Sequence, residues 1–576
     1  MKNVLSIICL LLFSQTTFVK AQQILVNQIG YDANASKRAI LVADAQQNDI
    51  KAFEIVSVAN QKTLFEGFLK PDASFKEWGD KYYYNLDFSG FRTSGEYIIQ
   101  LKGVTKVHSP KFKIGENLLA KSTLPALLHY FRNQRANTNI ELENDKHVQL
   151  FGSSKTVDLA GGWCDASGDV SKYFSHLAYA NFMSPQQIPL VTYTLIDAAD
   201  KMPKLLKSLK LTDSIKDEAV YGADYLVKSL SEEGYFYMIV FSYFNKDPKA
   251  RRVVGLHANS VTTNEYQCAF REGGGMAIAA LAKISTWQNL DPIKRNGYID
   301  AAQRAYEHLK TNNLKYCDDG KENIIDDYCA LMAASELYQA TRKEYFLKQA
   351  RIRVQNLQKR LNIKGYFISN DADRPYFHAS DAGLPLIALN RYMEVETDKT
   401  LINDARQIFD TNLAYQLKVT TAVENPFGYA RQTFKSQAGV KDTFFIPHEN
   451  ETGWWWQGEN ARLASLAAAA FTKGNQPANK NFAINQVNWI LGLNPYNMCF
   501  MYGFGEENVP YMASNYGHGC QKGGISNGIT GKDGAPDGAG IDFKKEASGN
   551  EWRWTEQWLP HAAWFLQAIT ELEKER

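Results

Sequence analysis

The sequence predicts two domains, a small β-sandwich followed by an α-helical barrel. Up to about residue 114, short alternating apolar runs are separated by turn residues, which is the pattern of strands. From about residue 116 onward, apolar residues recur three and four positions apart, which is the pattern of helices. The 576 residues, 45% of them hydrophobic, exceed what one ordinary core accommodates. We therefore expect the β-sandwich over residues 22–115 and the helical barrel over residues 116–576.

Residues 1–21 have the pattern of a signal peptide. Lys2 precedes an apolar run from Val4 to about Phe13, and a more polar stretch then leads to Ala21. The apolar run is shorter than the roughly 20 residues that a membrane helix needs. We expect cleavage after Ala21 and a secreted or periplasmic protein without a membrane span.

About seven strands and about a dozen helices are expected. Alternation is clearest in the strands at 38–42, 52–56 and 96–100. The helical period is clearest at 118–136, 190–209, 215–230, 275–287, 324–341, 381–393, 401–417, 460–471 and 557–572. Long loops rich in Gly, Asn and aromatic residues lie between the helices, especially at 498–556. Such loops usually carry function, so we expect them to build a cleft.

The composition favours a neutral partner. The formal net charge is +2, and Lys and Arg are spread along the chain, so nothing predicts binding to nucleic acid or to an anionic membrane. Aromatic residues make up 12% of the chain, which suits stacking on sugar rings, although large cores also use them. The cysteines after residue 21 lack the short paired spacing of a zinc site, and we expect buried thiols.

The first candidate catalytic motif is residues 161–169, Gly-Gly-Trp-Cys-Asp-Ala-Ser-Gly-Asp. Two carboxylates on a Gly-rich turn can share one water, with one orienting it while the other removes its proton. Asp165 and Asp169 are the candidates. The alternative is that Asp169 only caps a following helix.

The second candidate motif is residues 552–564, which lead into the last expected helix. A general acid must be protonated, and Trp-rich walls raise the pKa of a carboxyl group. Glu556 stands between Trp554 and Trp558 and is the preferred acid, with Glu551 as the alternative. The structural alternative is that Glu556 begins the helix with Thr555 as its cap, where the helix dipole would lower its pKa.

These motifs resemble glycoside hydrolase family 9, whose signature is Gly-Gly-Trp-Tyr-Asp-Ala-Gly-Asp. Residues 26–31, Val-Asn-Gln-Ile-Gly-Tyr, resemble the opening of the immunoglobulin-like domain that often precedes the family's (α/α)6 barrel. The resemblance covers nearly the whole mature chain and implies an inverting hydrolase of β-linked glucans. It implies Asp169 as the base, Asp165 as its partner and Glu556 as the acid, seven residues before Ala563 as in the family. Ser167 is one residue more than the commonest spacing, and Cys164 replaces an aromatic residue.

Candidate sugar-binding residues are polar or aromatic side chains in Trp- and Tyr-rich segments. His518 follows a Gly-x-Asn-Pro turn that resembles a family segment, but the family's paired His and Arg are missing. We therefore expect an altered subsite next to the cleaved glycosidic bond. This makes xyloglucan or mixed-linkage glucan as good a candidate for the substrate as cellulose. Core packing is the alternative role for these residues, and adjacent indoles diverge too much to line one cleft together. The candidates are His378, Asp381, Trp454, Trp455, Trp456, His518 and Trp554.

The expected function is that of an inverting endo-β-1,4-glucanase that acts as a monomer. An exo-acting β-glycan hydrolase is one rival, and a non-catalytic glycan-binding protein is another, against which the three retained carboxyl groups argue. No cofactor and no metal is expected for the chemistry. A structural calcium ion is compatible with the loop that carries Asp533, Asp537 and Asp542, although this loop lacks the full spacing of a calcium site.

Overall fold

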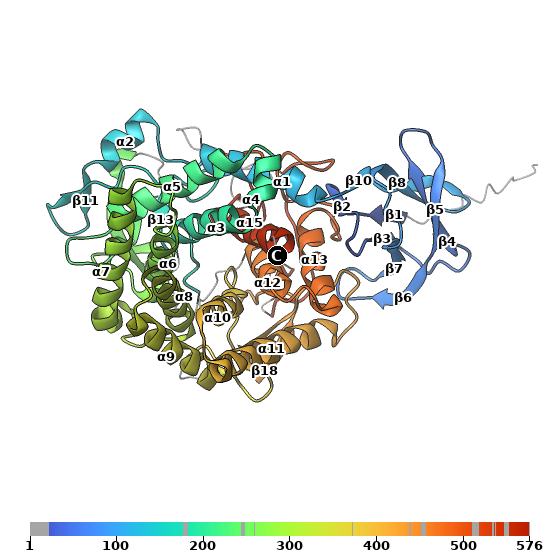
Figure 1. The fold of residues 1–576 in the computed structure, drawn as a ribbon. Helices are drawn as coiled ribbons and strands as arrows, with labels where there is room; N and C mark the ends of the chain where they lie inside the picture. The colour runs from blue at the N-terminus through green and yellow to red at the C-terminus, as the bar shows by residue number, and fades with distance from the viewer. Residues whose placement is uncertain are drawn as a thin grey trace, which may run out of the picture.

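The computed structural model shows a sheet-rich region beside a larger helical region (Figure 1). It describes residues 22–176, 183–243, 248–257, 260–370, 373–436, 439–450, 457–509, 518–532, 535, 537–545 and 552–574. The expected signal peptide therefore lies outside the described residues.

The N-terminal region contains two sheets that enclose one apolar core. One sheet has the strand order β1 (Gln22–Leu25), β3 (Arg38–Ala43), β7 (Lys81–Asp87), β6 (Lys70–Phe75). The other has the order β2 (Gly30–Asp32), β10 (Phe112–Gly115), β8 (Gly95–Leu101), β4 (Ala52–Ser57), β5 (Thr63–Phe68), and β9 (Val104–His108) pairs with β8. The three strands named from the sequence are confirmed as β3, β4 and β8. Inward residues of both sheets, such as Leu41, Phe53 and Ile99, form the core between them.

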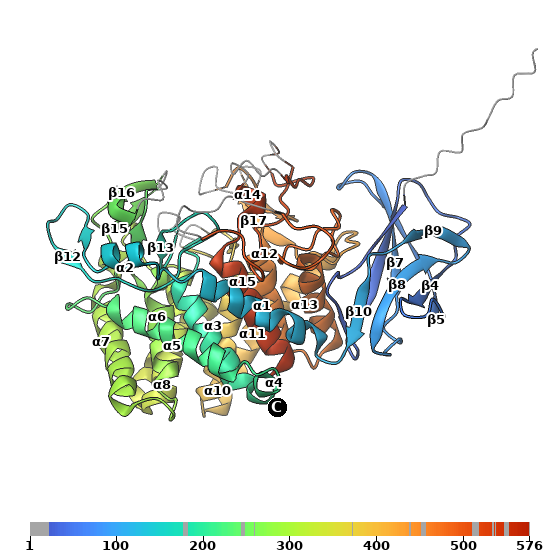
Figure 2. The same cartoon turned by 90° about the horizontal axis from the view of Figure 1, so that it is seen from above.

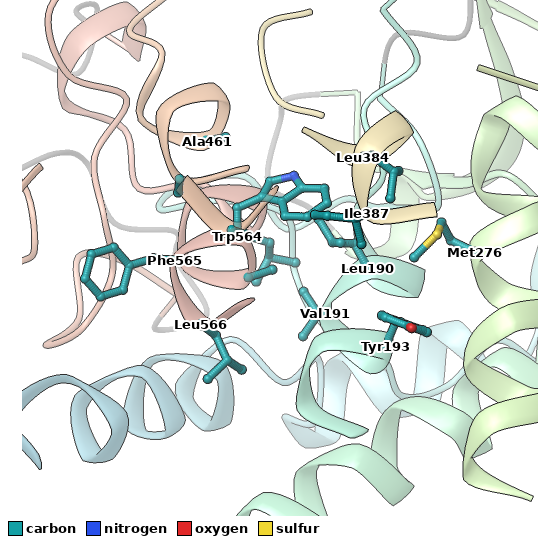
Figure 3. Packing of buried hydrophobic residues seen from close by; sticks show 14 of the residues in the cluster. Leu190, Val191, Tyr193, Met276, Leu384, Ile387, Ala461, Trp564, Phe565 and Leu566 are labelled. Atoms are coloured by element: carbon teal, nitrogen blue, oxygen red, sulfur yellow. The ribbon is translucent and has the colours of Figure 1, made fainter. Parts of the chain in front are cut away.

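Six helices that are buried along most of their length contact one another in a closed order. They are α3 (Ile188–Lys201), α6 (Gly275–Ile284), α8 (Ile324–Thr341), α10 (Leu384–Val395), α12 (Asn460–Phe471) and α15 (Leu559–Glu573), and α15 returns to α3. Figure 3 shows side chains of α3, α6, α10 and α15 near one another, among them Leu190, Met276, Leu384 and Trp564. Runs of alanine in α6 and α12 allow this close approach, because a small side chain lets helix backbones come near.

Each of these six helices also contacts an outer helix that is buried on one face only. The outer helices are α1 (Leu118–Asn133), α5 (Thr212–Lys228), α7 (Pro292–Tyr316), α9 (Glu344–Arg360), α11 (Lys399–Thr421) and α13 (Pro477–Ile490). Helix α7 was not among those named from the sequence because its buried face consists mostly of alanine and tyrosine. This region also contains the short helices α2 (Asn139–Asp145), α4 (Pro203–Ser208) and α14 (Trp552–Thr555).

The helical region also contains a six-stranded sheet that the sequence did not predict. Its strand order is β12 (Thr156–Val157), β11 (Val148–Leu150), β15 (Arg252–His257), β14 (Ile239–Phe241), β13 (Lys172–Tyr173), and β16 (Val261–Thr263) pairs with β15. These strands have two to six residues, too few for a period of two to stand out. Figure 2 shows β13, β15, β16 and the hairpin strand β17 (Gln432–Ser436) at the same end of the helices as α14 (Trp552–Thr555).

The two regions meet through an aromatic cluster and a set of hydrogen bonds. The ring of Trp78 lies 4.8 Å from that of Phe444 and 5.6 Å from that of Trp489. The Asn27 amide donates to Asn488 Oδ1 at 2.9 Å, and Gln28 N donates to Leu491 O at 2.8 Å. The segment that suggested the immunoglobulin-like domain therefore forms part of the contact with α13.

The buried thiols expected from the sequence are confirmed at Cys164, Cys268, Cys317, Cys329 and Cys499, whereas Cys520 is only partly buried. Within the described part of the chain, no helix has both the length and the apolarity needed to cross a membrane.

Candidate active site

The first catalytic motif forms an irregular loop that only glycine permits at its start. Gly162 has φ +74°, and a Cβ atom there would stand 2.9 Å from the ring of Tyr225. The Trp163 indole that follows is buried and donates to Glu218 Oε1 at 2.9 Å. This packing fixes the loop from which the two aspartates project.

Hydrogen bonds hold the first motif against the second. Leu559 N donates to Asp165 O at 3.1 Å, and Ser167 N donates to Gln557 O at 2.8 Å. The Ser167 hydroxyl oxygen accepts from Gln557 N at 2.9 Å. Ser167, the residue beyond the commonest spacing, therefore joins the loop directly to the neighbour of Glu556.

Asp165 is 3% exposed and its carboxylate is held on both oxygens. Oδ1 accepts from the Trp558 indole at 2.9 Å and from the Gln187 amide, while Oδ2 stands 3.6 Å from His176 Nδ1. Burial raises the pKa of Asp165 to about 6, against the opposing effect of His176. A carboxyl group that is held in this way is better suited to orient a water than to exchange protons with it.

Asp169 is more exposed than Asp165 and lies four residues further along the same turn. Its Oδ1 accepts from Ser171 N at 2.9 Å, and its Oδ2 accepts from the Tyr173 hydroxyl at 3.3 Å. No helix follows it directly, because Lys172 and Tyr173 form strand β13. The helix-capping alternative for Asp169 is therefore wrong.

Glu556 lies between α14 and α15 and is partly exposed. Its backbone is held by Asn527, whose N–H donates to Glu556 O at 2.9 Å. Helix α15 begins only at Leu559 with Trp558 as its N-cap, so Glu556 stands outside the first helical turn. The expected conflict with the helix dipole is therefore relieved. The alternative acid, Glu551, lies outside the described residues.

Sequence reasoning missed several neighbours of these carboxyl groups. Trp558 appeared only as a flanking indole, yet it donates a hydrogen bond to Asp165. Tyr130 on α1 is buried near both motifs, and burial raises its pKa well above the usual value, with Asp165 and Glu556 adding to the rise. An indole two residues after the acid was a usable signal for Trp558, whereas nothing in the sequence linked Tyr130 or Gln187 to the motifs.

Two of the predicted sugar-binding residues, His378 and Asp381, lie in the interior. Both are 0% exposed. Asp381 accepts from the Trp564 indole at 2.8 Å and from Gln186 N at 2.8 Å, and burial raises its pKa to about 7. His378 Nδ1 accepts from Ser380 N and Asp381 N, and burial lowers the pKa of the ring to about 3. Gln186 and Gln187 thus join this pair to the Asp165 loop.

Of the remaining predicted sugar-binding residues, the structure describes Trp554 and His518. Trp554 is 1% exposed, and its indole donates to Thr530 Oγ1 at 2.9 Å. His518 is 3% exposed and contacts Glu141. Trp454, Trp455 and Trp456 lie outside the described residues. Direct contact of any of these residues with a sugar stays a prediction.

The loop considered for calcium is described only in part. Asp533 lies outside the described residues. Asp537 stands 3.3 Å from Lys441 Nζ, and the backbone of Asp542 exchanges two hydrogen bonds of 3.0 Å with that of Thr530. The Asp537 carboxylate therefore has a partner from the protein itself.

Family models match both regions of the chain. The model of glycosyl hydrolase family 9 matches residues 121–536, and that of the cellulase N-terminal ig-like domain matches residues 19–106. The chain therefore belongs to glycosyl hydrolase family 9 and is a glycoside hydrolase with an immunoglobulin-like N-terminal domain. Glu556 lies beyond the matched segment.

Individual relatives are distant in sequence. The xyloglucan-specific endo-beta-1,4-glucanase of Bacteroides ovatus is 24% identical over 371 residues, which are 58% of this chain and 60% of that protein. The cellodextrinase of Butyrivibrio fibrisolvens is 23% identical over 521 residues, 84% of this chain and 85% of that protein. A metagenome-derived family 9 endoglucanase has a similar fold, with a TM-score of 0.68, 15% identity and coverage of 96% of this chain and 99% of its own.

Proposed function

We propose that the protein is an inverting endo-β-1,4-glucanase in which Asp169 is the base, Asp165 holds the water and Glu556 is the acid. The observation that supports this most is the set of hydrogen bonds between residues 165–167 and 557–559, which hold the two carboxyl-bearing segments together. Family membership supports hydrolysis, and the exposure of Asp169 and Glu556 supports their access to water and to a glycosidic oxygen.

The proposed reaction needs one proton transfer at each side of the sugar. Glu556 gives its proton to the glycosidic oxygen as the bond from that oxygen to the anomeric carbon breaks. Asp169 removes a proton from a water, whose oxygen bonds to the opposite face of the same carbon. Asp165 accepts a hydrogen bond from the other hydrogen of this water, which stays on the oxygen as part of the new hydroxyl group, and the product anomer is inverted. Only carboxyl groups and water take part.

We further propose that the closed order of inner and outer helices forms an (α/α)6 barrel. The contacts of α15 with α3 support closure of the inner ring. The proposed division is a signal peptide at 1–21, an immunoglobulin-like sandwich at 22–115 and the barrel at 116–576, and a secreted monomer is expected. The last strand of the sandwich ends at Gly115 and α1 begins at Leu118, which supports the boundary.

The proposed substrate is a β-1,4-linked glucan, cellulose-like, xyloglucan or mixed-linkage. The names of the two relatives support a glucan and leave both an internal and a terminal cut as candidates. The altered segment around His518 supports a subsite unlike that of the commonest cellulases. A terminal cut is kept as the second candidate because the cellodextrinase aligns over more of this chain.

A panel of soluble glucans tests the proposal. We expect a fall in viscosity at low release of reducing ends, together with an α-anomeric product in the first NMR spectra. Reducing ends without a fall in viscosity would replace the internal cut by a terminal one. Binding without any product would leave the glycan-binding alternative, and a β-anomeric product would refute the inverting mechanism.

A further inference from the structure

Tyr243 presents an aromatic side chain to solvent, which is rare in this protein. Among the described residues, only Phe68 and Tyr243 are aromatic residues with more than a third of their surface exposed. Phe68 belongs to β5 of the sandwich, whereas Tyr243 follows β14 in the helical region. A tyrosine ring is large and rigid, with an apolar body and a polar tip, and binding surfaces use it for this reason. The exposed ring therefore calls for a partner.

The pairing of β13 with β14 sets Tyr243 beside the proposed base. The two strands are antiparallel, and Lys172 pairs with Val240. Three residues further along this register, residue 243 is level with residue 169. Ser242 agrees with this placement, because its hydroxyl donates to Asp169 Oδ1 at 3.4 Å. Tyr243 is thus the next residue after one that contacts Asp169.

The ring of Tyr243 is held by its backbone and by a second aromatic ring. Tyr243 has φ +57°, in the left-handed region that a residue with a large side chain rarely adopts. Its ring lies 5.0 Å from that of Phe241, which is buried and lies 6.4 Å from the ring of Tyr173. Tyr173 in turn donates to Asp169. Strained conformations of this kind gather at functional sites, and this one fixes the ring relative to the base.

Tyr243 and Glu556 lie on different sides of the catalytic loop. Asp165 contacts the segment of Glu556 through Leu559 N, whereas Asp169 contacts the sheet through Ser242. In Figure 2, β13 and β15, which flank β14, lie to the left of α14, the helix next to Glu556. The acid protonates the oxygen of the leaving group. The side away from the acid therefore receives the part of the glucan that keeps the cleaved unit.

We propose that the ring of Tyr243 is the platform on which the glucose unit before the cleaved one stacks, on its non-reducing side. This rests on the proposed function, since it takes Asp169 as the base and a β-glucan as the substrate. The cleaved unit itself is not stacked there, because the water must approach its anomeric carbon from the side of Asp169. The unit before it has no such requirement, and its apolar C–H face packs well on an aromatic ring.

Two aryl glycosides test the platform, because a dinitrophenyl β-cellobioside has one glucose unit at this position and a dinitrophenyl β-glucoside has none. Tyr243→Ala should lower kcat/KM for the cellobioside at least about fivefold and leave that for the glucoside unchanged. Tyr243→Phe keeps the ring and should keep both values. Phe68→Ala, which removes the other exposed aromatic side chain, is the matched control and should also keep both. Equal losses on the two substrates in Tyr243→Ala would overturn the proposal.

Tyr243→Gly separates binding from folding. Glycine adopts the left-handed conformation without strain, so this variant should keep or raise Tm. It should nevertheless lose the preference for the cellobioside as Tyr243→Ala does. A lower Tm with an unchanged preference would give Tyr243 a structural role only and would overturn the proposal.

Calorimetric titration with cellotetraose makes the test independent of turnover. In an Asp169→Asn chain, which should not cleave the sugar, the further substitution Tyr243→Ala should weaken binding at least about fivefold. The proposal fails if the Asp169→Asn chain does not bind cellotetraose, or if both chains bind it equally. If the fivefold loss is found but the wild-type chain hydrolyses no β-glucan, the platform stands and the proposed function is refuted.

Discussion

At the residue scale, Asp165 and Asp169 have the same side chain in different surroundings. Asp165 is enclosed by Trp558, Gln187 and His176, whereas Asp169 is partly exposed although both of its oxygens accept hydrogen bonds. Different environments give two carboxyl groups different tasks. This contrast is the basis for giving Asp169 the proton transfer and Asp165 the orientation of the water.

The pH dependence of the reaction should report Asp165. Its pKa of about 6 is raised by burial and is lowered in part by the Trp558 indole. Asp165 must be ionised to hold the water, so kcat/KM on glucan should rise through about pH 6. Trp558→Phe removes the indole N–H that donates to Asp165, so the rise in kcat/KM should move to higher pH. Trp564→Phe is the control: it removes the indole that donates to Asp381 and should leave the pH of this rise unchanged. If Trp558→Phe also left it unchanged, the rise could not be assigned to Asp165.

The raised pKa of Asp165 should increase activity but decrease the stability of the fold as pH rises. Between the ordinary pKa of 3.8 and about 6, the folded chain binds more protons at Asp165 than the unfolded chain does. The contribution of this group to the free energy of unfolding therefore falls as pH rises through about 6. Keeping Asp165 ionised, as the proposed reaction requires, therefore lowers the stability of the fold above about pH 6.

At the scale of elements, the site depends on two loops that meet by backbone pairing. Ser167 and Gln557 are 390 positions apart and exchange two hydrogen bonds. Ser167→Ala would leave the buried Gln557 N–H without its acceptor, which costs about 1–3 kcal/mol. We expect a lower Tm and a lower kcat with little change in KM.

Ser175→Ala is the matched control for this substitution. Ser175 is equally buried, but its hydroxyl has no hydrogen-bond partner among the described residues. It should keep both Tm and kcat near the wild-type values. Equal effects of the two substitutions would show that Ser167 has no special part in joining the loops.

Elements with a strong local signal could be predicted from the sequence. The alternation at 52–56 predicts β4, and the helical period at 324–341 and 460–471 predicts α8 and α12, with their bounds. Strands β11 to β16 could not be predicted, because pairing between distant segments, and not local pattern, makes them strands. The motifs identified the candidate carboxyl groups, but their partners Trp558, Tyr130 and Gln187 depend on contacts that only the fold creates.

At the scale of the whole molecule, the sandwich and the helices share an apolar contact. Trp78 is 4% exposed and lies among Phe427, Phe444 and Trp489 of the helical region. A contact of this kind limits relative motion of domains. We therefore expect the N-terminal region to support α13 and not to move as a separate module.

Trp78→Ala tests this support. Loss of a buried indole should lower the free energy of unfolding by about 3–5 kcal/mol and lower Tm. Phe68→Ala, on an exposed residue of β5 in the same sandwich, should change it by less than about 0.5 kcal/mol. Thermal denaturation of the two variants gives the comparison, and equal effects would argue against a coupled interface.

The most direct measurement of the central claim compares Glu556→Gln and Asp169→Asn on two substrates, a soluble β-glucan and a dinitrophenyl β-cellobioside. The dinitrophenolate departs without a proton, so only the base is needed for that substrate. Glu556→Gln should lose at least about a hundredfold on the glucan and keep most of its activity on the aryl glycoside, whereas Asp169→Asn should lose activity on both. Near-normal hydrolysis of the glucan by Glu556→Gln, or equal losses of that variant on the two substrates, would contradict the account.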